Sequence, residues 1–347
     1  MIATLFLLSV GIPPTPSAAA PRAPLRLVAT LPNLKAIAEE VGGDRVTVDA
    51  LCAPTQDPHF LDPKPSYMTR LRDADLLLVN GLDLEVGWIG PLTEGARNAK
   101  LFRGAPGYVD CSTGVSLLEV PSGTLTRAEG DVHPFGNPHY LGDPLNALPV
   151  ADAIAAALAR SAPGDAPLFE ERRKAFRRKI EEAFFGRDLV ENVGGEKLVR
   201  LLDGGKIDAA LALSGPDGKP LSASLGGWFK RMRPLGGRAI VTYHRDWSYF
   251  TRRFGLSVAA NVEPKPGIEP SARHREEVRE VLERQKIPLL VTRPYVEHRS
   301  TDYLREKTGV AVLELPLEVG GFEGESDIVS FFDLVVEKVA GALEARG

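Results

Sequence analysis

The feature that most constrains the fold of this chain is a pattern of short apolar runs alternating with helical segments, which occurs twice along the sequence. Strands are expected in the first half at residues 27–30, 46–51 and 76–79, with helices at 34–41 and from 65 onward. Strands are expected in the second half at residues 239–243, 258–262, 289–292 and 310–315, with helices at 247–254 and 271–285. Runs of this kind between helices are typical of parallel βαβ units. The sequence therefore predicts an α/β protein with two parallel-sheet lobes.

A different pattern lies between the two lobes. Residues 146–160 are rich in alanine and helical in periodicity, and residues 167–185 form a charged, strongly helical run. A helix of about twenty residues spans roughly 30 Å, so it is long enough to join the lobes as a rigid link. Residues 186–237 are rich in glycine and weakly patterned, and no element is assigned to them. The chain is divided into a signal peptide at 1–20, an N-terminal α/β lobe at 25–145, a helical region with the linker helix at 146–185, an inserted segment at 186–237 and a C-terminal α/β lobe at 238–347.

The first twenty residues resemble a secretory signal. An apolar run over residues 2–11 precedes a segment rich in proline and serine and then three alanines that end at Ala20. We expect cleavage near Ala20 and export to the periplasm or beyond the cell, although no Lys or Arg precedes the apolar run as is usual. An oxidising compartment permits one disulfide between the only two cysteines, Cys52 and Cys111, but two buried free thiols fit the sequence equally well.

Composition excludes several classes of protein. Lys and Arg number 42 against 46 Asp and Glu, and this near balance argues against a nucleic-acid-binding protein, which normally has a basic excess. After the N-terminus there is no apolar run long enough for a membrane-spanning helix. The hydrophobic content of 44% excludes a disordered chain.

Three of the six histidines occupy positions that favour metal binding. His59 follows the second predicted strand, His139 lies in the run NPHY, and His244 ends the strand at 239–243. Since ligands of open parallel sheets bind beyond the carboxyl ends of the strands, these imidazoles are expected to meet in one cleft between the lobes. Neutral imidazole suits zinc and other late divalent ions, and binding should weaken as pH falls through the usual imidazole pKa of about 6.5.

The other histidines are interpreted differently. A histidine on a helix or in a loop is usually solvated or bonded to the backbone, and we prefer this interpretation for His274 and His298. His133 lies six residues before His139, so it is either a residue at the cleft mouth or a structural residue of the same kind as the other two.

Together these motifs resemble those of a known family. The runs are DPH at 57–59, NPHY at 137–140 followed by GDP at 142–144, and TYH at 242–244 with aromatic residues shortly after. In this order they are similar to the metal-binding motifs of the zinc/manganese substrate-binding proteins of ABC importers. The runs VEPKPGI at 262–268 and LP to VGG at 315–321 are similar to one branch of that family. The resemblance extends from about residue 26 to the C-terminus, interrupted by 186–237.

The resemblance implies a fold and a set of ligands. The family has two α/β lobes joined by one long helix, and its first three ligands fall on His59, His139 and His244. A histidine at the third place resembles the zinc-preferring members, so the expected ion is Zn²⁺, with Mn²⁺ as the alternative. The acidic fourth ligand falls on Pro316, and we expect Glu318 to substitute for it, or water to complete the shell. The histidine-rich loop of many zinc members is missing.

The resemblance also implies a function in transport. The chain would be an extracytoplasmic, monomeric solute-binding protein that captures a divalent transition metal between its lobes and delivers it to an ABC permease, without catalysis. One alternative is a zinc-dependent hydrolase, in which Glu318 or Glu263 would act as general base on a metal-bound water. A surface adhesin of the same fold is the other alternative.

Overall fold

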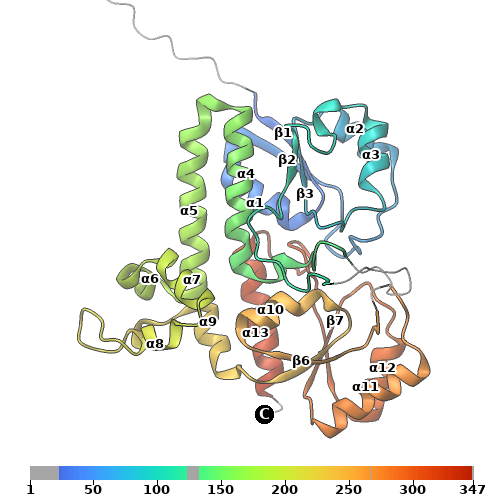
Figure 1. The fold of residues 1–347 in the computed structure, drawn as a ribbon, viewed down its shortest axis with the longest axis vertical. Coiled ribbons are helices and arrows are strands. Elements are labelled where there is room, and N and C mark those ends of the chain that lie inside the picture. The colour runs from blue at the N-terminus through green and yellow to red at the C-terminus, as the bar shows by residue number, and fades with distance from the viewer. Residues whose placement is uncertain (1–22, 123–132, 266, 346–347) are drawn as a thin grey trace, which may run out of the picture.

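Two parallel sheets, one in an upper and one in a lower lobe as drawn in Figure 1, form the body of the molecule. This computed structural model describes residues 23–122, 133–265 and 267–345, so the predicted signal peptide at 1–20 lies outside the described residues. Within the described parts of the chain, no helix has the length and apolar character needed to cross a membrane.

The upper sheet belongs to the N-terminal lobe. Its parallel strands lie in the order β2-β1-β3-β4 and span Leu25–Ala29 (β1), Val46–Ala50 (β2), Leu76–Val79 (β3) and Tyr108–Asp110 (β4). The helices of this lobe are α1 (Pro32–Gly42), α2 (Pro65–Arg72) and α3 (Ile89–Ala96). Every residue of β3 is buried, as expected of a central strand covered on both faces.

The lower sheet repeats this topology in the C-terminal lobe. Its parallel strands lie in the order β6-β5-β7-β8 and span Ala239–Thr242 (β5), Ser257–Asn261 (β6), Leu289–Thr292 (β7) and Ala311–Glu314 (β8). The helices are α10 (Ser248–Phe254), α11 (Ala272–Arg284) and α12 (Arg299–Thr308). The prediction of two parallel-sheet lobes is confirmed.

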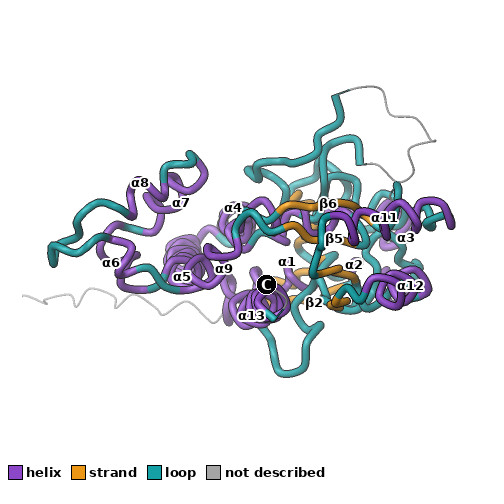
Figure 2. The backbone as a smooth tube through the Cα atoms, turned by 90° about the horizontal axis from the view of Figure 1, so that it is seen from below, coloured by secondary structure: helices purple, strands orange, loops and turns teal. Residues whose placement is uncertain are grey.

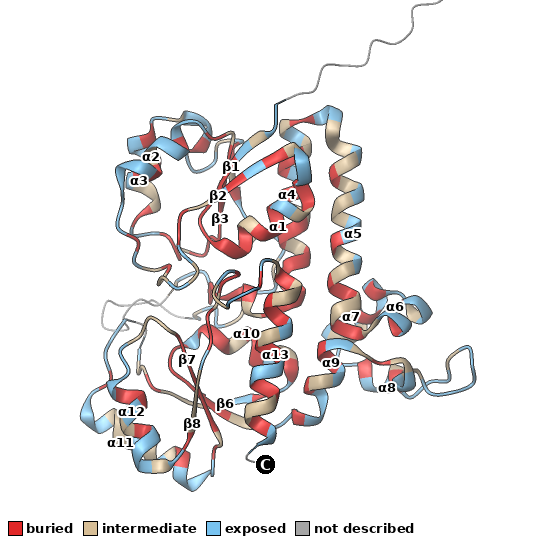
Figure 3. Ribbon diagram, turned by 180° about the vertical axis from the view of Figure 1, so that it is seen from behind, coloured by how far each residue is buried: buried red, intermediate tan, exposed pale blue. Residues whose placement is uncertain are grey.

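Long helices run beside both sheets. Helix α4 (Ala147–Ser161) and helix α5 (Ala166–Phe185) form an antiparallel pair, within a residue or so of the helices predicted at 146–160 and 167–185 (Figure 1). A third helix, α13 (Ile328–Glu344), begins with a capping box at Asp327 and was not predicted. Figure 3 shows that α1, α4 and α13 are largely buried, so they belong to the core that joins the lobes.

The segment 186–237, to which the sequence assigned no element, is helical. It contains α6 (Arg187–Val193), α7 (Gly195–Asp203), α8 (Ile207–Leu211) and α9 (Gly227–Met232). Helices α6 to α8 project sideways from the end of α5 and cover neither sheet (Figures 1 and 2). A Cβ on Gly186 would lie 2.6 Å from the Cα of Gly226, and Gly186 has φ 87°, so this close backbone crossing requires glycine.

The two cysteines lie at opposite edges of the upper sheet. Cys52 follows edge strand β2 and Cys111 follows edge strand β4, and both are buried and free. Burial raises the pKa of each thiol. Of the two states that the sequence left open, the structure shows buried thiols.

Candidate metal centre

Three imidazole rings converge at the seam between the lobes. His59, His139 and His244 each present one ring nitrogen, and these nitrogen atoms all lie within 4.8 Å of one another. The ring centroids are 5.1 Å apart for His59 and His139, 5.7 Å for His59 and His244, and 5.3 Å for His139 and His244. The structure thus brings together the three histidines that the sequence predicted. Such a set of converging nitrogen donors can hold a divalent transition metal.

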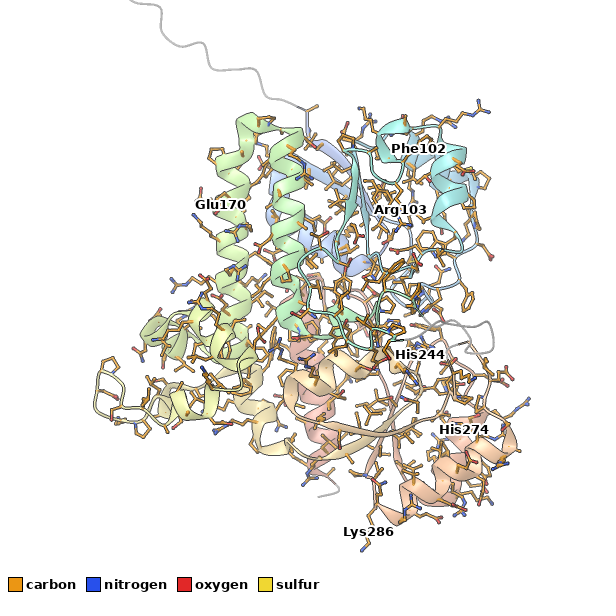
Figure 4. All side chains as sticks on the ribbon, in the orientation of Figure 1. Phe102, Arg103, Glu170, His244, His274 and Lys286 are labelled. Carbon is orange, nitrogen blue, oxygen red and sulfur yellow. The ribbon has the colours of Figure 1, made fainter. Side chains whose placement is uncertain are left out.

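Each lobe contributes to this group. His59 lies in the loop after β2, and His139 immediately precedes a short 3-10 turn, Tyr140–Gly142, that leads toward α4. His244 comes two residues after the last residue of β5, and Figure 4 shows it at the level where the lobes meet. The buried indole of Trp88 donates to the carbonyl of Pro58 at 2.9 Å and thereby fixes the loop that carries His59.

Asn137 connects the two sides of the site. Its side-chain oxygen accepts a hydrogen bond from the backbone N–H of His139 at 2.9 Å, and its Nδ2 donates to the carbonyl of Arg245 at 2.8 Å. Tyr249, on α10 of the lower lobe, donates its hydroxyl to the carbonyl of Asn137 at 2.9 Å. The residues next to His139 and His244 are therefore held together across the seam by hydrogen bonds.

Carboxylates orient two of the three rings. Nδ1 of His59 lies 2.7 Å from Oδ1 of Asp57, and Nδ1 of His244 is hydrogen-bonded to Oε2 of Glu263. A carboxylate on Nδ1 fixes the tautomer and leaves the lone pair on Nε2, the nitrogen that would bind a metal. Sequence reasoning did not assign these roles to Asp57 and Glu263, although the aspartate in DPH, two residues before the ligand, was an available signal.

The third ring has a buried nitrogen without a hydrogen-bond partner. Nε2 of His139 makes no hydrogen bond to any residue that the structure describes, and the side chain is buried. Burial, followed by the charges of the neighbouring histidines, lowers the pKa of His139 well below its usual value. His139 is therefore neutral at a lower pH than the usual imidazole pKa predicts, and its lone pair is available to a metal across the physiological range.

His133 lies beside this group. Its Nε2 is 3.2 Å from Nε2 of His59, although it is not one of the three converging histidines. Burial, followed by the charges of His59 and His244, lowers the pKa of His133 to about 3. Of the two interpretations that the sequence left open, the position next to the site is the one observed.

Glu318, the predicted fourth ligand, is not one of the three converging groups. Its Oε2 accepts a hydrogen bond from the backbone N–H of Asn33 at 3.0 Å, at the start of α1. The side chain of Asn33 in turn donates to the carbonyl of Leu317 at 2.9 Å and accepts from the backbone N–H of Val319 at 2.7 Å. Glu318 and His139 line the same small cavity, of about 20 Å³. The assignment of Glu318 as a ligand stays a prediction.

The remaining histidines lie away from the seam. Nε2 of His274 is 3.0 Å from the carbonyl of Asn261, and Figure 4 shows this residue far out on the lower lobe. His298 is exposed, and its Nδ1 lies 3.6 Å from a carboxylate oxygen of Glu314. Both are ordinary surface or backbone-bonded histidines, as expected.

The sequence matches a family of transport proteins. The family model described as "Zinc-uptake complex component A periplasmic" (ZnuA) matches residues 27–184 and 225–342. The manganese ABC transporter substrate-binding lipoprotein PsaA of Streptococcus mitis is 22% identical over 292 residues, which are 83% of this chain and 78% of that protein. The iron-binding protein YfeA of Yersinia pestis is 23% identical over 330 residues, which are 91% of this chain and 85% of that protein.

Solved structures share the fold. A crystal structure of ZnuA has a TM-score of 0.67 and 20% identity, and the match covers 92% of this chain and 99% of that one. The manganese-bound S38A mutant of a periplasmic metal-binding protein from Candidatus Liberibacter asiaticus has a TM-score of 0.66 and 17% identity, with the same coverage. The family model does not match residues 185–224. These residues run from the end of α5 through the projecting helices α6 to α8 and stop just before α9.

Proposed function

This chain belongs to the ZnuA family of periplasmic zinc-uptake components, and from that premise we propose that it carries Zn²⁺ as its cargo to the permease of an ABC importer. It is a substrate-binding protein for divalent metal ions that works outside the cytoplasm, and it is not an enzyme. Beyond what the family match shows, we propose that the chain prefers zinc and binds it through the residues described above. We also propose that a signal peptide directs it to the periplasm and that it is a monomer.

The observation that carries the choice of zinc is the set of three converging imidazoles, His59, His139 and His244. Nitrogen donors suit zinc, whereas manganese is better served by carboxylate, carbonyl and water oxygens. The relatives named above include proteins described as binding manganese and iron, so relatedness alone does not select the ion. The donor chemistry of this chain favours Zn²⁺ over Mn²⁺.

For the fourth position we propose that Glu318 acts through a water molecule. The cavity of about 20 Å³ that Glu318 shares with His139 is large enough for one water. Such a water would bind the metal with its oxygen and donate a hydrogen bond to the carboxylate, which is already oriented by Asn33. This arrangement completes four-coordinate zinc with three protein nitrogens and one oxygen.

The two alternative functions gain no support. The family that matches is one of transport components, and the relatives reported above are described as substrate-binding or metal-binding proteins. Neither a zinc hydrolase nor a surface adhesin is indicated by these matches.

A competition titration tests the proposed function. The mature chain is purified, stripped with a chelator, and titrated with Zn²⁺ and with Mn²⁺ against a chromophoric chelator of known affinity. We expect one zinc ion per chain and a clear preference for zinc. Uptake of Mn²⁺ at least as tight as that of Zn²⁺ would contradict the choice of cargo, and the absence of stoichiometric uptake of either ion would contradict the function itself.

Replacing Glu318 by glutamine tests its role. If the carboxylate orients a metal-bound water, the substitution should weaken zinc binding by about tenfold, since outer partners of metal ligands typically contribute ten- to a hundredfold. Asp327→Asn is the matched control, because Asp327 is an acidic residue of the same C-terminal region whose carboxylate accepts hydrogen bonds from the backbone at the start of α13. An E318Q variant with the affinity of the wild type would remove Glu318 from the site.

The affinity should also depend on pH through this buried acid. Burial raises the pKa of Glu318 to about 8, and this outweighs the opposing effect of the hydrogen bond from Asn33. Below this pKa the carboxyl is protonated in the metal-free protein, and metal binding must displace the proton. The association constant should therefore rise with pH, by up to about tenfold per unit, and level off above the pKa. Titrations on both sides of neutrality should show a smaller slope for E318Q, and an unchanged slope would count against the assignment.

A further inference from the structure

The carboxylate of Asp57 contacts residues of both lobes. Asp57 lies in the loop after β2 of the upper lobe, and its Oδ1 is 2.7 Å from Nδ1 of His59. Its other oxygen, Oδ2, lies 3.9 Å from Nη1 of Arg293, which directly follows β7 of the lower lobe. The residue that orients one metal ligand is thus also an ion-pair partner of the opposite lobe.

Arg293 is held in place by its own lobe. Only 4% of the residue is exposed, and its guanidinium carbon lies 4.9 Å from the ring centroid of Tyr295. Nε of Arg293 lies 3.3 Å from Oδ2 of Asp246, which is 1% exposed and two residues beyond the ligand His244. A chain of polar contacts therefore runs from the partly buried His59 and Asp57 through the buried Arg293 and Asp246 to the segment that carries His244.

This chain of polar contacts is incompletely hydrogen-bonded. Among the described parts of the chain, neither Nε nor Nη1 of Arg293 has a hydrogen-bond partner, and neither do the two carboxylate oxygens of Asp246. Burying charged groups without hydrogen bonds costs free energy. Arg293 lies 3.3 Å from Asp246 and 3.9 Å from Asp57, so a small movement that shortens either distance would lower this cost. Because Asp57 and Arg293 belong to different lobes, a movement that shortens their contact is a closing of the seam.

We propose that Arg293 is a positioning residue that couples occupancy of the metal centre to closure of the two lobes. A metal ion draws His59 and His244 toward each other. Asp57 moves with His59, and its Oδ2 reaches hydrogen-bonding distance of Arg293, which stabilises the closed, metal-bound form. Loss of Arg293 then weakens metal binding although the residue touches no metal. This inference rests on the proposed function, since it assumes that the three histidines hold the ion.

A double-mutant cycle tests the coupling. Arg293→Met, Asp57→Asn and the double variant are made in the full mature chain, and their zinc affinities are measured by competition titration. We expect R293M to weaken binding by about tenfold in the wild-type background and by less than about threefold in the D57N background, because the interaction is already lost there. R293K, which keeps the charge but not the planar fork, should recover part of the loss. Arg299→Met is the control, because Arg299 is an exposed arginine on α12.

The outcomes separate this inference from the function on which it rests. Equal effects of R293M in both backgrounds, or wild-type affinity in R293M, would overturn the coupling while the wild type still binds one zinc ion. Failure of the wild type to bind zinc would overturn the function instead. Melting curves of the metal-free variants report whether each one folds. If R293M does not fold, R293K is combined with D57N in its place. The coupling again predicts that the arginine substitution weakens zinc binding less in the D57N background than in the wild-type background.

Discussion

Replacing His244 by alanine should weaken zinc binding by more than about a hundredfold. The substitution removes the ligand that we propose for the lower lobe, and even the outer partners of metal ligands contribute ten- to a hundredfold. It also leaves the partly buried Glu263 without the ring that it orients. The remaining pair, His59 and His139, comes from one side of the seam, so the ion would no longer bridge the lobes. Competition titration of the stripped variant measures the loss.

A second histidine provides the control for this variant. His274→Ala removes an imidazole of the same lobe whose Nε2 is bonded to a backbone carbonyl, far from the seam (Figure 4). Its zinc affinity should match that of the wild type. Tight one-to-one binding in H244A would mean that the lower lobe supplies no essential ligand, and the interlobe site would have to be abandoned.

Replacing Phe184 by alanine should produce the largest loss of stability among the substitutions considered. Phe184 lies near the end of α5, is 0% exposed, and stacks on Phe229 of α9 at 5.7 Å and on Phe254 of α10 at 5.6 Å between ring centroids. It therefore joins the linker helix to α9 and to the lower lobe. Truncating a buried phenylalanine typically costs about 3 to 5 kcal/mol, through lost burial and the cavity left behind. We expect a loss of this size in the free energy of unfolding.

Denaturant unfolding of the metal-free protein measures this effect, and it is best followed by a probe in the lower lobe, since the lobes need not unfold together. The matched control is Phe102→Ala, because Phe102 is 42% exposed on the upper lobe (Figure 4). The control should change stability by less than about 1 kcal/mol. A similarly small effect for F184A would show that the end of α5 does not hold the lower lobe in place.

The parts of the fold that the sequence predicted are those with regular periodicity. Strand β7 was predicted with its observed limits, because a short run of three apolar residues and a β-branched threonine between Pro288 and Arg293 has few alternatives. Helix α5 was predicted within one residue, because its charged and apolar positions alternate with a helical period. Helices α6 to α9 were not predicted, because they are short and their glycines are selected by backbone contacts such as that between Gly186 and Gly226, which only the tertiary structure reveals.

The site shows the same division. The convergence of His59, His139 and His244 was predicted because each follows a strand or a proline-containing loop and because the carboxyl ends of parallel strands converge. Glu318 was chosen by its distance from Pro316 in the sequence, and sequence distance does not determine where a side chain in an irregular segment points. Arg293 was missed because its role depends on an ion pair across the seam, between residues 236 positions apart (293 − 57).

The most direct test of the central claim is a crystal structure of the zinc-loaded protein with diffraction data collected on both sides of the zinc absorption edge. The account predicts a single anomalous peak per chain, about 2.0 to 2.1 Å from one ring nitrogen of each of His59, His139 and His244. A peak bound by ligands from one lobe only, or a zinc ion bound elsewhere while the three rings remain free, would contradict it.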